Sequence, residues 1–207
     1  MSSSSLYIIN TKYKGKQLFE YANSWLFSPI VWQVLGDKYF KEDDKGRKPS
    51  ILSPFDGQDA WKDLNNIMNN SENTDERICW ELSNQNVFYT KDKDFISDRI
   101  RYFVSTHQNY GSIEIETGNK NYLLRAKHIN ERFTQIAKDI KNLDEKKYPY
   151  FVLKNTSCDD SVEYWFEYDE KKRRYKTLKD WDELPAEFVC IENNKIIGFT
   201  RIKKENL

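Results

Sequence analysis

The sequence predicts an α+β protein, with a mostly helical N-terminal half followed by an antiparallel sheet, a meander of about five strands packed on helices. Two patterns along the chain support this fold class. Before residue 144, apolar residues recur in several segments at steps of three and four, the period of an amphipathic helix. From residue 150 onward they recur at every second position, as in a half-buried strand. We expect one compact domain over 1–207, or a subdivision into a helix-rich part, 1–110, and a sheet-rich part, 111–207.

The first half is expected to alternate strands with helices. Apolar and aromatic residues alternate over 6–12, which predicts a strand, whereas 17–26 is expected to be helical. Ser28 and Pro29 are a typical N-cap and first helical residue, so the next helix begins there and ends near Leu35. Apolar spacing and capping residues predict the remaining elements: helices over 56–70, 74–82 (with Thr74 as N-cap) and about 92–107, and a strand over 86–90.

The second half changes from helix to strand. Residues 112–116 alternate cleanly and are followed by turn residues at 117–119, so a hairpin with a partner strand at 122–125 is expected. Asn130 is expected to cap a helix with a strongly amphipathic stripe, formed by Phe133, Ile136, Ala137, Ile140 and Leu143. The strands expected after it cover 150–153, 162–168, 174–178, 188–191 and 195–202.

Charge and hydropathy exclude several classes of protein. Lys and Arg number 33 and Asp and Glu number 33, so the net charge is zero and an overall basic nucleic-acid-binding surface is not expected. The sequence contains no run of about 18 apolar residues that could span a membrane. The first residues, MSSSS, lack the basic and apolar parts of a secretory signal. We therefore expect a cytoplasmic protein that binds no membrane.

Cofactor and metal sites are not expected. Cys79, Cys158 and Cys190 are widely spaced, and the two histidines do not complete a zinc site with them at the usual spacing. The sequence has no phosphate-binding loop and no glycine motif for a dinucleotide. We expect three reduced thiols, no metal and no cofactor.

Two stretches resemble known families but differ from them at the positions that carry the chemistry. LYIINTKYKGKQLF at 6–19 resembles the start of the GIY-YIG nucleases. However, Phe19 stands where that family has its second tyrosine, and the first arginine of the chain is Arg47, in a loop. FVCIENNKIIGFTRIK at 188–203 resembles the central hairpin of GNAT acetyltransferases, but no glycine-rich cofactor loop precedes it. The first stretch is expected to be a strand followed by a turn and a helix, and the second an ordinary hairpin.

RYFVSTH at 101–107 resembles the Arg-x(4–6)-His signature of HEPN ribonucleases. The resemblance implies that His107 moves a proton and that Arg101 steadies a phosphate. At about 100° per residue, His107 falls within the apolar stripe of its helix and Arg101 lies roughly 120° away from it. A nucleic-acid-directed, ribonuclease-like enzyme using these two residues is the alternative hypothesis for function.

SVEYWFEYDEKKRRYK at 161–176 contains the strongest candidate for a binding surface. Trp165 shares the polar face of its expected strand with Glu163 and Glu167. Arg174 and Lys176, on the next strand, are its expected neighbours. Trp and Arg are the commonest anchors of protein interfaces. Burial of this face under a second packed layer is the competing interpretation.

These five residues support the leading hypothesis, a non-enzymatic intracellular interaction module with a protein partner. By loose analogy with orphan proteins of this size, it fits an accessory, inhibitor or immunity protein of a bacterial or phage conflict system. The enzyme using Arg101 and His107 remains the second hypothesis, and a ligand pocket between sheet and helices is a third.

Overall fold

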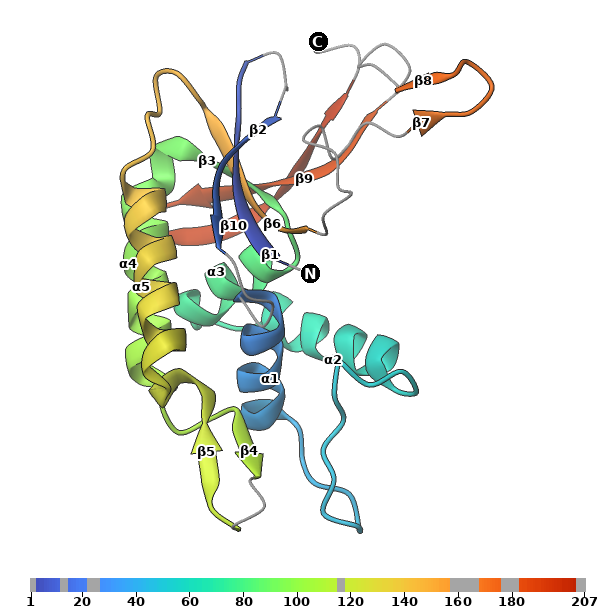
Figure 1. Ribbon diagram of the computed structural model, residues 1–207, viewed down its shortest axis with the longest axis vertical. Coiled ribbons are helices and arrows are strands. Elements are labelled where there is room, and N and C mark those ends of the chain that lie inside the picture. The colour runs from blue at the N-terminus through green and yellow to red at the C-terminus, as the bar shows by residue number, and fades with distance from the viewer. Residues whose placement is uncertain are drawn as a thin grey trace.

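A six-stranded mixed sheet occupies one end of the molecule, and helices extend from it toward the other end (Figure 1). The computed structural model describes residues 3–11, 15–21, 27–114, 118–156, 168–175 and 183–203. The strand order is β10-β9-β3-β6-β1-β2. The strands are β1 (Ser3–Ile9), β2 (Gly15–Tyr21), β3 (Val87–Tyr89), β6 (Tyr150–Thr156), β9 (Glu183–Glu192) and β10 (Lys195–Lys203).

The helices surround a core beneath this sheet, and α4 and α5 run side by side on one side of that core (Figure 1). They are α1 (Phe27–Tyr39), α2 (Gly57–Asn69), α3 (Thr74–Ser83), α4 (Lys93–Thr106) and α5 (Lys127–Lys141), with 3₁₀ turns η1 (Thr90–Asp92) and η2 (Leu123–Arg125). Two small hairpins complete the described elements: β4 (Ser112–Glu114) with β5 (Lys120–Tyr122), and β7 (Tyr168–Asp169) with β8 (Arg174–Tyr175). The two hairpins lie at opposite ends of the molecule (Figure 1).

Both faces of the central strands are buried. Leu6 and Ile8 of β1 belong to the core shared with the helices, and the alternate residues Tyr7 and Ile9 are buried as well. Successive side chains of a strand point to opposite faces, so a strand covered on both sides has a continuous apolar run. The run LYII in β1 and the run FVL at 151–153 in β6 have this form.

The predicted helical stripes form the rest of the core. The stripe of α5 is buried as expected, and the ring of Phe133 stacks on that of Phe27 in α1 with centroids 4.7 Å apart. Trp80 of α3 is fully buried, and its indole N–H donates a hydrogen bond to Asn65 of α2 at 3.1 Å. The helices predicted over 56–70, 74–82 and 92–107 are confirmed to within about two residues as α2, α3 and α4.

The predicted arrangement of helices followed by an antiparallel five-strand meander is wrong. The sheet has six strands and is mixed, because β3 pairs with β9 in parallel while its other pairs are antiparallel. The strands β1 and β2 precede every described helix, and α5 follows the β4–β5 hairpin. Parallel neighbours need a long crossover connection, and here the chain passes through α4, α5 and β6 between β3 and β9. Apolar periodicity carries no information on this strand order.

Three local predictions also differ from the structure. The expected helix over 17–26 is instead the strand β2 over Gly15–Tyr21, because pairing with β1 overrides the local preference. The expected partner strand at 122–125 is shorter and earlier, since β5 ends at Tyr122 and a 3₁₀ turn follows. Helix α5 begins at Lys127, before the expected cap Asn130.

Both edges of the sheet are irregular. The register of β2 against β1 shifts at Leu6 and Tyr7, and that of β10 against β9 shifts twice. Bulges bend an edge strand and disturb its ladder of hydrogen bonds, which disfavours pairing with another chain. The apolar side chains exposed on these strands are Leu18, Phe19, Ile197 and Phe199.

Gly111 connects α4 to the β4–β5 hairpin at a point where the chain passes close to α1. Its φ is +74°, and a Cβ there would lie 2.8 Å from Cγ2 of Val34. Gly118 has the same φ, but a Cβ there would meet nothing within 4 Å. Substitutions at these two glycines therefore distinguish the effect of backbone strain from that of steric crowding against Val34.

We predict that Gly111→Ala lowers the free energy of unfolding more than Gly118→Ala does. Gly118→Ala carries only the strain of a positive φ, about 1 kcal/mol. Gly111→Ala adds the displacement of Val34, roughly 1–3 kcal/mol more. Urea unfolding of the two variants and the parent chain measures this difference. Equal losses for the two variants would show that the approach to α1 is not tight.

Candidate functional site

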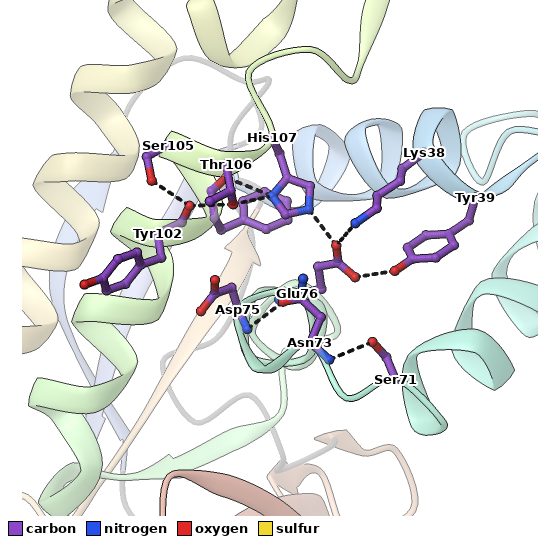
Figure 2. A network of polar contacts seen from close by, with 11 residues as sticks. Lys38, Tyr39, Ser71, Asn73, Asp75, Glu76, Tyr102, Ser105, Thr106 and His107 are labelled. Atoms are coloured by element: carbon purple, nitrogen blue, oxygen red, sulfur yellow. Dashed lines mark hydrogen bonds and ion pairs between the residues drawn. The ribbon is translucent and has the colours of Figure 1, made fainter.

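A buried carboxylate, that of Glu76 in α3, joins three helices (Figure 2). Its Oε1 accepts hydrogen bonds from Nζ of Lys38 and from Nε2 of His107, the latter at 2.6 Å. Its Oε2 accepts a hydrogen bond from the hydroxyl of Tyr39 at 2.5 Å. Lys38 and Tyr39 form the last turn of α1, and His107 is the C-cap of α4. We call these four residues the Glu76 cluster.

The N-terminus of α3 places Glu76 for this role. Oδ1 of Asn73 accepts hydrogen bonds from the backbone N–H groups of Asp75 and Glu76 at 3.1 and 3.2 Å, so the N-cap is Asn73 and not the predicted Thr74. The third residue after an N-cap commonly reaches back to the cap. In this chain the Glu76 side chain instead points away from α3 toward α1 and α4 (Figure 2).

Both ring nitrogens of His107 face hydrogen-bond acceptors. Nε2 contacts the Glu76 carboxylate, and Nδ1 lies 3.0 Å from the carbonyl oxygen of Phe103 and 2.9 Å from Oγ1 of Thr106. Thr106 uses its own proton to donate to the carbonyl oxygen of Tyr102. Both ring nitrogens therefore lie at hydrogen-bond distance from partners on α3 and α4, which fixes the orientation of the imidazole beside the carboxylate.

The donors around Glu76 keep its carboxyl group ionised. Burial alone would raise the pKa of Glu76, but the hydrogen bonds from His107, Lys38 and Tyr39 outweigh burial and lower it to about 2. Burial and the same carboxylate raise the pKa of the Tyr39 hydroxyl, so that group remains a donor. The cluster is a compensated set of charges inside the helical core.

A second buried glutamate in α3, Glu81, has the opposite shift. Burial raises its pKa to about 7, with a further rise from the nearby charge of Glu187. Its side-chain donor among the described residues is the amide of Asn86, at 2.7 Å, and Arg77 lowers the pKa only in part. The two carboxyl groups on this helix thus differ because Glu76 accepts hydrogen bonds from three side chains, one of them the Lys38 ammonium, and Glu81 from a neutral amide.

The structure does not bring Arg101 and His107 together. His107 is 2% exposed, and both sides of its ring are enclosed, with the Phe103 ring stacked at 4.4 Å. Arg101 lies on the exposed side of α4. A general base must lie within reach of a substrate proton, and the buried His107 is already bound to Glu76. The geometry of these two described residues favours a structural role for His107.

The last turn of α1 also organises the surface through Asp37. Oδ2 of Asp37 accepts hydrogen bonds from the backbone N–H groups of Gly111 at 2.9 Å and Ser112 at 3.4 Å. Oδ1 is paired with Nζ of Lys48 at 2.7 Å. Burial would raise the pKa of Asp37, but these hydrogen bonds lower it overall. One carboxylate therefore ties the β4–β5 hairpin and the loop after α1 to the same helix.

These two tethered segments form the walls of an open groove, which we call the α1 groove. Its volume is about 920 Å³, and its floor is the start of α1, including Ile30. Leu52 of the loop and Ile113 of β4 line it and remain 40% and 46% exposed. The other lining residues are Pro29, Gln33, Ser50, Ser53, Lys120, Asn121, Tyr122, Leu123, Arg125, Ala126, His128 and Ile129.

Among the described residues that line the α1 groove, the charged side chains and the histidine are all basic. They are Lys120 of β5, Arg125 of η2 and His128 of α5, and each is exposed. The guanidinium of Arg125 lies over the ring of Tyr122 at 4.7 Å and donates to the carbonyl oxygen of Gln108 at 2.8 Å. α5 begins here with no acidic residue in its first turn, so the positive end of its dipole is also at the groove.

Only Arg174, of the five residues in the predicted binding surface around Trp165, is among the residues that the structure describes. Glu163, Trp165, Glu167 and Lys176 are outside the described residues. Arg174 is exposed in β8, opposite Asp169 of β7. That hairpin and the β4–β5 hairpin are at opposite ends of the molecule (Figure 1), so a role for Arg174 remains a prediction about a second surface.

Within the described residues, no group of three or more His, Cys, Asp or Glu side chains is placed to hold a metal ion. Cys79 and Cys190 are free thiols, and burial raises the pKa of the Cys79 thiol. The helices in this part of the chain are too short or too polar to cross a membrane. Comparison with protein-family models, curated proteins and solved structures gave no match.

We predict that Glu76→Gln lowers the free energy of unfolding at pH 7 by about 3 kcal/mol, because the Lys38 ammonium loses its counter-charge and the donors around this buried site lose a charged acceptor. The folded-state pKa of Glu76 is below its ordinary value of 4.5. The stabilisation is therefore present above pH 4.5 and is lost as the pH falls toward 2. The difference from the parent chain should shrink over that window in urea unfolding. The exposed Glu72→Gln is the control, and an equal loss there would contradict this role.

We predict the opposite pH dependence for Glu81→Gln. The folded-state pKa of Glu81 is raised to about 7, so the parent chain loses stability as the pH rises from 4.5 through 7. A glutamine keeps the acceptor for Asn86 without the charge. The variant should be more stable than the parent at pH 8, by roughly 1–3 kcal/mol, and no more stable at pH 4. If the variant is instead less stable than the parent at pH 8, burying the ionised Glu81 carboxylate carries no free-energy cost.

Proposed function

We propose that the chain is a non-enzymatic module that binds a partner protein through the α1 groove. The observation that supports this most directly is an open groove lined by the exposed apolar residues Leu52 and Ile113, with Ile30 at its floor. Large apolar side chains that remain exposed around a depression are typical of interaction sites. Polar residues surround them, as in the rim of an interface.

A further exposed apolar side chain lies on the same loop, outside the lining of the groove. Phe55, three residues after Leu52, is 97% exposed. A small ligand would occupy only the groove, whose volume falls within the range of roughly 300–1,000 Å³ for small-molecule sites. A protein segment could contact both the groove and Phe55, and aromatic side chains are enriched in protein interfaces. This additional apolar side chain favours a protein partner over a small molecule.

Other exposed apolar residues are less suitable as a docking surface. Leu18, Phe19, Ile197 and Phe199 lie on the two edge strands of the sheet. Both edges carry register shifts, which disfavour the addition of a further strand. The α1 groove has no such obstruction, and its walls are tied to α1 through Asp37.

The enzyme hypothesis with Arg101 and His107 receives less support. The His107 ring is buried and bonded to Glu76, and Arg101 is on the exposed side of the helix. The basic side chains that line the groove are those of Lys120, Arg125 and His128. None of the residues lining it is a carboxylate, so the paired acids used for general acid–base hydrolysis are not provided by its described lining.

We predict that Ile113→Asp abolishes partner binding while Ile197→Asp preserves it. Both isoleucines are exposed on strands, 46% and 58%, but only Ile113 lines the groove. A displayed library of random 12-residue peptides, selected on the full chain, supplies the binding segments. Peptides with apolar anchors should bind the parent and Ile197→Asp equally, and should bind Ile113→Asp at least about tenfold more weakly.

Circular dichroism and thermal unfolding establish that both variants are folded before binding is compared. Selection of no peptide, or equal binding of the selected peptides to Ile113→Asp, would overturn the assignment of the groove as the binding site. Loss of binding in both variants would place the contact elsewhere on the apolar surface.

A further inference from the structure

We infer that the α1 groove selects an apolar segment with carboxylates on one side of its anchors. This inference deepens the proposed function and depends on it. The chain as a whole has equal numbers of acidic and basic residues. The groove departs from that balance, because the described residues of its lining include Lys120, Arg125 and His128 and no acidic residue.

The cation of Arg125 is held in place by neutral acceptors. It donates to the carbonyl oxygen of Gln108 and to the side-chain oxygen of Asn109, and it stacks on Tyr122. These contacts fix the direction of the guanidinium without neutralising its charge. A positioned cation at an apolar groove favours a ligand carboxylate, because the desolvated pair is stronger than one in bulk water.

The two walls of the groove differ in charge. Lys120, Arg125 and His128 all belong to the segment from β5 to the first turn of α5, which forms one wall. On the side of the loop after α1, the groove adjoins a polar pocket of about 270 Å³ that contains Glu42 of this loop and the paired Asp37 and Lys48. Carboxylates of a partner are therefore favoured on the β5–α5 side, whose described charged lining is basic.

This asymmetry assigns an orientation to the bound segment. Its apolar anchors contact Leu52, Ile113 and Ile30, and its acidic residues lie on the side that faces Lys120, Arg125 and His128. A segment with acids on both sides of the anchors would place one group on the side of Glu42 and bind more weakly. The recognised class is thus an acidic amphipathic peptide with its charge on one side.

Lys120 and Lys127 provide a matched pair for the test. Both are exposed lysines, but Lys120 lines the groove and Lys127, one residue from His128, does not. Replacement of either by Glu changes the net charge equally. Lys127 pairs with Glu131 at 3.8 Å with both side chains largely exposed, so its loss costs little.

The peptide library selected on the parent chain should yield apolar anchors with Asp or Glu enriched on one side. Lys120→Glu should weaken these peptides about tenfold at low salt, and Lys127→Glu by less than twofold. The difference should shrink as the salt concentration rises, because exposed charges are screened. Selection repeated on Lys120→Glu should lose the acidic enrichment.

Three results are distinguishable. One-sided acidic enrichment with loss in Lys120→Glu supports the inference. Apolar peptides that depend on Ile113 but show no acidic preference, or that bind Lys120→Glu and Lys127→Glu equally, overturn the inference and leave the groove assignment intact. Peptides that bind Ile113→Asp as well as the parent overturn the proposed function itself.

Discussion

The helical part of the molecule depends on the carboxylate of Glu76. It is fully buried, and it accepts hydrogen bonds from Lys38 and Tyr39 of α1 and from His107 of α4, while its own backbone begins α3. Such a charge is tolerated inside a protein only when its donors replace the lost water. These hydrogen bonds are directional, whereas the apolar contacts around them are not. The relative placement of three helices therefore follows from one charged group and its partners.

Glu81 shows that burial alone does not determine the charge of such a group. It lies on the same helix as Glu76 and is 3% exposed, yet its pKa is raised to about 7 whereas that of Glu76 is lowered to about 2. The difference lies in the partners: the Lys38 ammonium, the Tyr39 hydroxyl and the His107 ring for Glu76, and the amide of Asn86 for Glu81. The protonated form of Glu81 requires no counter-ion, so this end of α3 can pack near β9 without a second charged cluster.

Local periodicity predicted the parts of the fold that local forces determine. Apolar spacing predicts the helices α2 and α3 to within about one residue at each end. The strand over Gly15–Tyr21 is instead predicted to be helical, because only its pairing with β1 defines it. The contact between Glu76 and His107 could not be predicted from local patterns either, because the two residues are 31 positions apart in the sequence. The α1 groove combines residues from α1, its following loop, the β4–β5 hairpin and α5. Its one sequence signal was the apolar Leu52 and Phe55 within a polar loop.

The groove is prepared for binding by the same turn of α1 that anchors the core. Lys38 and Tyr39 point inward to Glu76, while Asp37 holds the backbone of the hairpin at Gly111 and the loop through Lys48. A surface built from loops normally loses affinity to the cost of ordering them when a partner arrives. Because Asp37 bridges both walls, part of that cost is met during folding, before a partner arrives. The buried ionic cluster and the open apolar groove are thus two sides of one helix end, which links the stability of the core to the shape of the surface that we propose binds a partner.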